Sequence, residues 1–206
     1  MLDKERNYYG DSVSSIVGVD EAGRGPWAGP VFAGAVVFPR DFASEEINDS
    51  KQLSAKKREE LFDLILANAL GYGIARVEAR DIDRLDIYEA TKVCMKIAIS
   101  QIHVPYQLII TDAMPLKNLD VPVVPLIKGD ATCLNVAAAS ILAKVSRDRY
   151  MTELESTYPM FSFAKHKGYG TKAHREELEK YGPIPLVHRD SYAPIAELRN
   201  KDLALF

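Results

Sequence analysis

Short apolar segments of β-strand length alternate with longer segments of helical periodicity, and this order restricts the chain to few folds. Strands are predicted over residues 16–19, 31–38, 73–77, 108–110 and 121–127. Helices are predicted over residues 54–69, 86–98, 135–157 and 172–180, with a last helix near Ile195. Three strands come early and the later elements alternate, so we expect an α/β domain with a central mixed five-stranded sheet flanked by helices.

Local features of three segments predict how the sheet is built. A short glycine-rich connection joins the first two strands, which favours their antiparallel pairing. Pro122 and Pro125 lack the amide hydrogen that a central strand needs, so the segment 121–127 is expected at an edge of the sheet. Alanines at positions 137–139 begin the longest helix, and their small side chains would let that helix lie close against the sheet.

Length and charge bound the class of protein. The 206 residues suit a single domain, residues 1–206, with a small helical part over about residues 160–206. Hydrophobic residues make up 47% and charged residues 27%, a balance typical of a globular protein. The net charge is −3, so any surface that binds nucleic acid has to be local rather than general.

The termini and cysteines indicate a cellular compartment. The charged N-terminal residues lack the apolar run of a signal peptide, and no segment approaches the roughly 20 apolar residues that span a bilayer. Cys94 and Cys133 form no C-x-x-C pair and are expected to be reduced core residues. We therefore expect a soluble cytoplasmic protein without a membrane partner.

Acidic residues stand where apolar strands end. Asp20, Glu21 and Asp112 each follow a strand, and Asp130 lies between the last strand and the longest helix. Four carboxylates at one site would repel one another unless divalent cations neutralised them. Mg²⁺ and Mn²⁺ prefer such oxygen ligands, and two ions about 4 Å apart can support phosphodiester hydrolysis. Helix caps and solvated turns use the same residues, so the pattern by itself leaves both interpretations open.

The pair Asp20 and Glu21 adds a geometric condition. Consecutive residues of a strand point to opposite faces of the sheet. We therefore expect the first strand to end between these two residues, so that both carboxylates can reach one site.

A glycine-rich turn follows the first acids. Glycine lets the main chain approach a ligand closely, and Arg24 between Gly23 and Gly25 could bind a phosphate. The turn lacks the lysine and hydroxyl residue of a P-loop and the spacing of a dinucleotide-binding loop. An ordinary hairpin turn is the alternative interpretation.

The segment 156–175 is basic and contains no acidic residue. Aromatic residues are interleaved with its cations, a composition typical of a surface that follows a phosphate backbone, although a solvated face would look similar. Its basic side chains are Lys165, His166, Lys167, Lys172, His174 and Arg175. His166 and His174 could form an acid–base pair for metal-free RNA cleavage, but nothing near them in the sequence supports that pairing.

Five sequence blocks occur together in one order. They are residues 20–25 (Asp-Glu-Ala-Gly-Arg-Gly), 49–54 (Asp-Ser-Lys-Gln-Leu-Ser), 128–130 (Lys-Gly-Asp), 137–145 (Ala-Ala-Ala-Ser-Ile-Leu-Ala-Lys-Val) and 166–171 (His-Lys-Gly-Tyr-Gly-Thr). With these blocks the chain resembles bacterial ribonuclease HII, a type 2 ribonuclease H, from about residue 16 to about residue 194. The first block distinguishes it from ribonuclease HIII, which lacks the Gly-Arg-Gly sequence.

The resemblance implies a fold, a site and an activity. The implied fold is ribonuclease H-like with a small C-terminal helical part, and the implied site holds two Mg²⁺ or Mn²⁺ ions on Asp20, Glu21, Asp112 and Asp130. The implied enzyme hydrolyses the RNA strand of RNA–DNA hybrids and nicks duplex DNA on the 5′ side of single ribonucleotides. It leaves 3′-hydroxyl and 5′-phosphate ends and serves ribonucleotide and primer removal.

The resemblance also implies how substrate is recognised. The main chain of Gly23, Arg24 and Gly25 would read the ribonucleotide 2′-hydroxyl, the group that distinguishes RNA from DNA. Tyr169 would pack on the sugar of the following deoxynucleotide. Phosphate contacts would come from Lys51, Lys144 and Arg147.

Two positions depart from the family pattern, and one terminal motif is incomplete. Many members have Asp-Gly-Asn at the third acid, whereas this chain has Asp112 followed by Ala113 and Met114. Asp86 replaces an asparagine before a helix, an exchange that should preserve the cap. The segment from Asp202 to Phe206 loosely resembles peptides that bind sliding clamps but lacks their leading glutamine. Clamp binding is therefore a hypothesis, and we expect a monomer.

Two other functions remain open at the level of sequence. A metal-dependent nuclease for DNA junctions or transposition would use the same acids but would cut branched all-DNA substrates. A non-catalytic module that binds hybrids would bind equally well after Asp20→Asn and Asp112→Asn and would release no product.

Overall fold

A five-stranded mixed sheet forms the centre of the protein. The structure is a computed structural model that describes residues 2–48, 50 and 52–203. The strand order is β3-β2-β1-β4-β5, in which β1, β2 and β3 pair antiparallel while β4 and β5 join β1 in parallel. The strands are β1 (Ile16–Ala22), β2 (Val31–Val37), β3 (Gly71–Val77), β4 (Leu108–Asp112) and β5 (Val123–Leu126). The predicted mixed sheet, the antiparallel first pair and the edge position of the last strand are confirmed.

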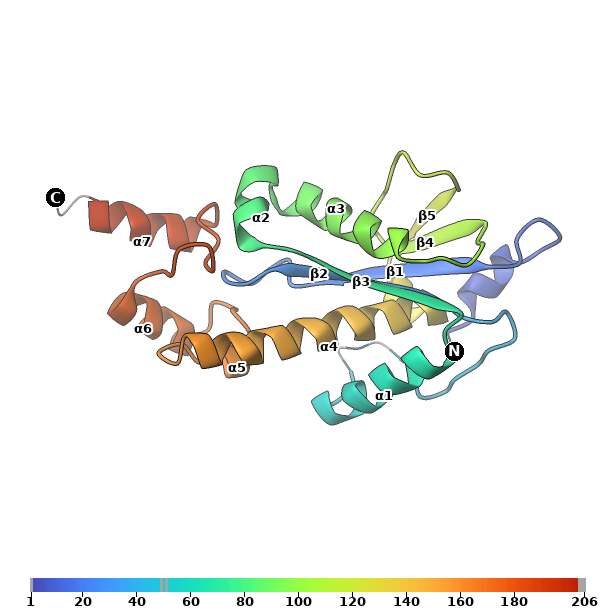
Figure 1. The fold of residues 1–206 in the computed structure, drawn as a ribbon, viewed down its shortest axis with the longest axis horizontal. Helices are drawn as coiled ribbons and strands as arrows, with labels where there is room; N and C mark the ends of the chain where they lie inside the picture. Colours follow the sequence, from blue (N-terminus) through green and yellow to red (C-terminus); the bar gives the residue numbers. More distant parts are fainter. Residues whose placement is uncertain (1, 49, 51, 204–206) are drawn as a thin grey trace.

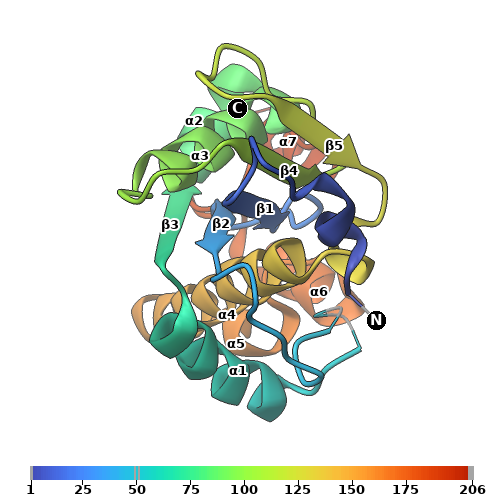
Figure 2. The same cartoon turned by 90° about the vertical axis from the view of Figure 1, so that its right-hand side faces the viewer.

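Helices cover both faces of the sheet, and a small helical part extends beyond one end (Figure 1). One face carries α2 (Ala79–Leu85) and α3 (Ile87–Ser100), and the other carries α4 (Leu134–Thr157) with α1 (Ala55–Asn68) outside it, as the end view in Figure 2 shows. The terminal part consists of α5 (Phe163–His166), α6 (Lys172–Tyr181) and α7 (Ala193–Leu203). Within the described residues, no helix combines the length and apolarity needed to cross a bilayer.

The long helix α4 lies unusually close to β1 and β2. A Cβ atom added at Gly18 would stand 2.2 Å from the main chain of Asn135, and one added at Gly34 would stand 2.3 Å from the carbonyl oxygen of Ala139. A side chain larger than that of glycine at either strand position would leave no room for this approach. The expected close packing of residues 137–139 is therefore confirmed, and it fixes which residues of α4 lie over the end of β1.

Several short elements were not predicted from the sequence. The sequence predicted neither the short helices α2 and α5 nor the 3₁₀ helix η1 (Lys4–Tyr8), which are too short to show a periodic pattern.

The helix predicted over 86–98 is confirmed as α3. Asp86 caps it as expected, because its carboxylate accepts hydrogen bonds from the amides of Tyr88 and Glu89 at 2.7 and 3.0 Å.

Both cysteines are free and buried, as predicted. Burial raises the pKa of the Cys94 thiol to about 12 and that of Cys133 to about 11. Neither thiol is therefore a nucleophile at neutral pH.

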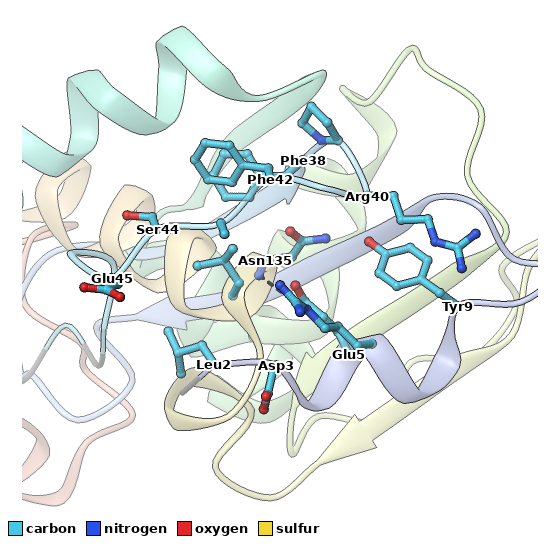
Figure 3. A pocket seen from close by; sticks show the side chains of 14 residues that line it. Leu2, Asp3, Glu5, Tyr9, Phe38, Arg40, Phe42, Ser44, Glu45 and Asn135 are labelled. Carbon is cyan, nitrogen blue, oxygen red and sulfur yellow. Dashed lines mark hydrogen bonds between the residues drawn. The ribbon is translucent and has the colours of Figure 1, made fainter.

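A distant acid caps the beginning of α4. Cys133 occupies the N-cap position, but its side chain makes no capping hydrogen bond to the helix. The amide of Asn135 instead donates to the carboxylate of Glu5 in η1 at 3.1 Å. Glu5 points to Asn135 in a cavity whose wall also includes Tyr9 and Arg40 (Figure 3). Burial is the main cause that raises the pKa of Glu5 to about 7. The N-terminal segment thus supplies the hydrogen-bond acceptor that this end of the helix needs.

Replacement of Glu5 by glutamine should change how stability depends on pH. The raised pKa means that the folded protein binds more protons than the unfolded chain between about pH 4.5 and pH 7, so the contribution of Glu5 falls as pH rises through this interval. The free energy of unfolding of Glu5→Gln, relative to wild type, should therefore increase from pH 4.5 to pH 7 and then level off. Denaturant titrations at several pH values measure it. Glu45→Gln, an exposed residue of the same cavity, is the control and should leave the profile unchanged.

Candidate active site

Three of the four predicted acids meet at one edge of the sheet. Asp20 of β1, Asp112 at the end of β4 and Asp130 of η2 (Gly129–Ala131) each place a carboxylate oxygen within 4.8 Å of the others. The parallel pairing of β1 with β4 brings the first two together, because its last partners are Val19 and Thr111. The third acid arrives through a loop in which the amide of Gly129 donates to Asp112 at 2.8 Å. Such a set of oxygen ligands could hold a divalent cation.

Glu21 reaches the same edge in a way that the sequence did not predict. The expectation that β1 ends between Asp20 and Glu21 is wrong, since β1 continues to Ala22 and stays paired with β2. What ends is the pairing with β4, so the edge beyond Val19 is open on that side. Asp20 and Glu21 both line one cavity together with Asp112, and the amide of Glu21 donates to the carboxylate of Asp20 at 2.8 Å.

The acids repel one another in this structure. The pKa of Asp20 lies well above its usual range, first because the side chain is buried and then because Glu21 and Asp112 are close. Burial is also the main cause that raises the pKa of Glu21, where Arg24 acts in the opposite direction. The Oε2 atom of Glu21 is buried without a hydrogen-bond partner among the described residues. A bound cation would relieve both the repulsion and the unsatisfied oxygen.

Two serines support Asp20, and sequence reasoning assigned neither a role. The hydroxyl of Ser140 bonds to the carboxylate of Asp20 and lies 2.9 Å from the buried hydroxyl of Ser50. Arg58 holds the loop of Ser50 by donating to the carbonyls of Ser50 and Leu53 at 3.0 and 2.6 Å. Ser50 lies in the sequence block 49–54 and Ser140 in the block 137–145. Membership of these blocks was the one feature of the sequence that could have indicated a role for them.

A cavity of about 360 Å³ opens beside the acids. Its lining includes Gly23, Lys144 and Tyr169, with Tyr169 exposed to 44%. A Cβ atom added at Gly25 would stand 3.7 Å from the ring of Tyr169, so the turn of residues 23–25 and the aromatic ring are neighbours. Lys144 is ion-paired to Asp148 at 2.7 Å and keeps part of its side chain exposed. The candidate recognition residues thus border the candidate metal site.

Arg147 takes a position that does not suit the predicted phosphate contact. Its side chain is only 1% exposed, and its nitrogen atoms donate to three main-chain carbonyls. The acceptors are Pro30 at 3.0 Å, Lys167 at 3.0 Å and Ala28 at 3.1 Å. Arg147 therefore fastens the segment after β1 to the segment after α5. Lys51, which was also predicted to contact a phosphate, lies outside the described residues.

Several aromatic and histidine side chains of the basic segment 156–175 belong to the core rather than to a binding surface. Phe161 and Phe163 are buried and stack on each other with ring centroids 5.2 Å apart, and His166 and His174 are buried beside them. The exposed members are Lys165, Tyr169, Lys172 and Arg175. The sequence pattern did not distinguish these two sets, because a burial pattern within short helices and turns has no clear period.

The histidines are placed for structure. His166 bonds to Glu177 at 2.9 Å, and His174 bonds to His188 at 3.1 Å. Burial lowers the pKa of His174 to about 4 and that of His188 to about 3, so both rings are neutral at pH 7. These contacts do not present an exposed acid–base pair to a substrate, and the position of the rings argues against metal-free cleavage.

Comparisons with known proteins agree with one another. The family model described as Ribonuclease HII matches residues 17–194. A ribonuclease HII from Leuconostoc mesenteroides is 49% identical over 197 residues, which cover 96% of this chain and 77% of that protein. The crystal structure of the ribonuclease H2 from Pyrococcus horikoshii OT3 superposes with a TM-score of 0.77 at 26% identity, covering 91% of this chain and 98% of that one.

A further solved structure bears on the C-terminal hypothesis. The PCNA–ribonuclease HII complex from Archaeoglobus fulgidus matches with a TM-score of 0.69 at 26% identity, covering 93% of this chain and all of that one. That archaeal protein is seen in a complex with PCNA. In the present chain, residues 204–206 of the clamp-like segment lie outside the described residues, so clamp binding stays a prediction.

Mn²⁺ should stabilise the wild type and not Asp20→Asn. At roughly a hundred times its dissociation constant, the ion should raise the wild-type melting temperature by about 5–10 °C, because it binds only the folded cluster. In chelator, Asp20→Asn should melt at or above the wild-type temperature, since one repelling charge is gone. Scanning calorimetry measures both, with exposed Asp63→Asn as the matched control. An equal Mn²⁺ shift in wild type and Asp20→Asn would contradict the metal assignment.

Proposed function

The chain belongs to the ribonuclease HII family, and on that premise we propose an endonuclease with two related substrates. It hydrolyses the RNA strand of RNA–DNA hybrids, and it nicks duplex DNA on the 5′ side of a single embedded ribonucleotide. Family membership accounts for the general ribonuclease H activity. The meeting of Asp20, Asp112 and Asp130 beside the turn of residues 23–25 is the observation that carries the finer proposal. We propose that it acts as a monomer in the cytoplasm, in ribonucleotide and primer removal.

The metal requirement follows from the donor set. Asp20, Asp112 and Asp130 would hold Mg²⁺ or Mn²⁺, with Glu21 contributing a further oxygen from the same cavity. A pair of such ions supplies an activated water and stabilisation of the leaving oxygen. The protein's own part is to hold the acids in place through Ser140, the Gly129 amide and the β1–β4 pairing.

The turn of residues 23–25 suits recognition of a 2′-hydroxyl by the main chain. Gly23 has φ +98°, and a Cβ atom there would stand 2.1 Å from Nε of Arg147, so no other residue fits without rearrangement. Gly23 lines the cavity, and the two following residues, Arg24 and Gly25, are exposed. Small residues let a ribose approach the main chain to hydrogen-bond distance. A sugar without the 2′-hydroxyl would leave the main-chain polar groups at that position unpaired, and the site would therefore reject it.

We propose that Tyr169 tests the next sugar along the strand. Its ring is the exposed aromatic surface beside Gly25 and lines the same cavity as the acids. A flat apolar ring packs well on a deoxyribose, and a 2′-hydroxyl in that position would lose solvation against it. The turn and the ring together would therefore recognise a ribonucleotide followed by a deoxynucleotide.

The proposed polarity of the products follows from the attacking group. Water attack leaves a 3′-hydroxyl and a 5′-phosphate, whereas attack by the 2′-hydroxyl would need a base near the ribose and would end as a cyclic phosphate. His174 and His188 are buried and neutral, and they bond to each other instead of to the cavity. This placement supports water as the nucleophile.

One duplex with a single internal ribonucleotide tests the activity. Wild type should nick it on the 5′ side in Mg²⁺ or Mn²⁺, should lose activity in chelator and should leave all-DNA duplex intact. Asp112→Asn should slow the reaction roughly a hundredfold or more while the melting temperature in chelator stays within a few degrees. Gel analysis of the labelled strand measures the rates and the product ends. Cutting of a branched all-DNA substrate would point to a junction nuclease, and binding without product release to a non-catalytic module.

Removal of the Tyr169 ring should reduce the preference for a ribonucleotide followed by DNA. Tyr169→Ala should lower kcat/KM on the single-ribonucleotide duplex by about tenfold or more, while Tyr169→Phe should retain most of it because the ring surface remains. Steady-state kinetics on the two variants measure the difference. Equal losses in both variants would show that the phenolic hydroxyl, and not the ring, makes the contact.

A further inference from the structure

The two elements of the proposed recognition site are both fastened to one short stretch of the C-terminal part. The turn of residues 23–25 follows β1, and the tyrosine loop (residues 166–171) follows α5, far apart in the sequence. His188 pairs with Ala28 as an isolated antiparallel bridge, and the amide of Arg189 donates to the carbonyl of Trp27 at 2.8 Å. The side chains of His188 and Arg189 then extend to the two elements separately.

Arg189 holds the turn of residues 23–25. Its side chain is fully buried, and Nη2 donates to the carbonyls of Gly23 at 2.7 Å and Gly29 at 2.8 Å. Nη1 donates to the carbonyl of Arg24 at 3.0 Å and to the hydroxyl of Tyr192 at 2.8 Å, and that hydroxyl donates to the same carbonyl at 2.5 Å. A buried guanidinium is tolerated only when its donors are satisfied, so the fork fixes where these carbonyls lie.

His188 holds the tyrosine loop through a second histidine. The amide of Ile184 donates to Nδ1 of His188 at 2.8 Å, so the hydrogen of this neutral ring is on Nε2. That Nε2 donates to Nε2 of His174 at 3.1 Å, which leaves the hydrogen of His174 on Nδ1. Nδ1 of His174 then donates to the carbonyl of Tyr169 at 3.0 Å. A chain of three oriented hydrogen bonds thus runs from Ile184 to the main chain of Tyr169.

The acids of the metal site are supported by other contacts. Ser140 bonds to Asp20, the amide of Gly129 bonds to Asp112, and the β1–β4 pairing fixes both strands. None of these contacts involves His188 or Arg189. A change at this pair should therefore affect recognition before it affects cation binding.

We propose that His188 and Arg189 are positioning residues that set the spacing between the turn of residues 23–25 and Tyr169, and through it the selectivity for a ribonucleotide followed by a deoxynucleotide. The inference rests on the proposed function, because it concerns the same recognition site. Neither side chain touches the substrate. Their effect is transmitted by the carbonyls of Gly23 and Arg24, which Arg189 holds. It is also transmitted by the carbonyl of Tyr169, which His188 holds through His174.

Arg189→Lys tests the arginine. Lysine keeps the charge but not the planar fork, so it cannot hold the carbonyls of Gly23 and Arg24 in one geometry. Selectivity is measured as kcat/KM on a single-ribonucleotide duplex divided by kcat/KM on a hybrid whose cut strand is RNA throughout. This ratio should fall about tenfold or more in Arg189→Lys. The matched control is Arg199→Lys, which changes a neighbouring arginine of the same part whose bond goes to Asp190 at 3.0 Å, and it should keep the ratio.

His188 gives a second test that does not depend on burying a lysine. His188→Phe keeps the ring that packs on Phe161 and Phe163 but removes the hydrogen bond to His174. His188→Gln keeps a donor near the position of Nε2. The ratio should fall in His188→Phe and be largely restored in His188→Gln. A role limited to stability would instead lower the rates on both substrates together in proportion to the loss of folded protein.

The melting temperature and the Mn²⁺-induced shift of each variant are measured in parallel, and rates are taken well below unfolding. Unchanged selectivity in folded Arg189→Lys and His188→Phe, or equal losses on both substrates, would overturn the inference while leaving the proposed function intact. Wild type that fails to nick the single-ribonucleotide duplex in Mg²⁺ or Mn²⁺ would overturn both. Loss of the Mn²⁺ shift in these variants would also overturn it, since the pair would then support the metal site.

Discussion

Repulsion among buried carboxylates is the constraint on which the rest of the structure depends. Asp20 is buried next to two other acids, and burial disfavours its charged form even before their charges are counted. Such a cluster costs stability unless the fold holds it rigidly and a cation compensates it. The fold does so with a serine pair, a main-chain amide and two parallel strands, which together prevent the acids from moving apart.

Close packing of α4 on the sheet places these supports. Because Gly18 and Gly34 let the helix approach the strands, Ser140 lies over Asp20 and Arg147 lies against Gly23. The same helix therefore supports the acids through Ser140 and the turn of residues 23–25 through Arg147, about two helical turns later. Arg147 and Arg189 join that turn to the C-terminal part, each through main-chain carbonyls. The metal site and the recognition site are thus separate constructions on shared elements.

Much of the fold followed from local pattern, and the failures have identifiable physical causes. The five strands, the cap at Asp86 and the tight helix at residues 137–139 were predictable because period, capping and side-chain size act over a few residues. The end of β1 was mispredicted because it depends on the partner strand: β4 stops at Asp112 while β2 continues to pair with Ala22. Arg147 was assigned to a phosphate because an arginine on a helix gives no local sign of which carbonyls will surround it.

The sequence by itself determined the residue types of the site, their order along the chain and the family to which the chain belongs. Tertiary structure alone decided which basic and aromatic residues face the cavity and which are buried, as Tyr169 and His174 illustrate five residues apart. It also decided that His188 and Arg189 hold elements about 20 and more than 160 residues away. The physical reason is that hydrogen bonds between distant segments depend on how the whole chain packs, and no short-range periodicity records them.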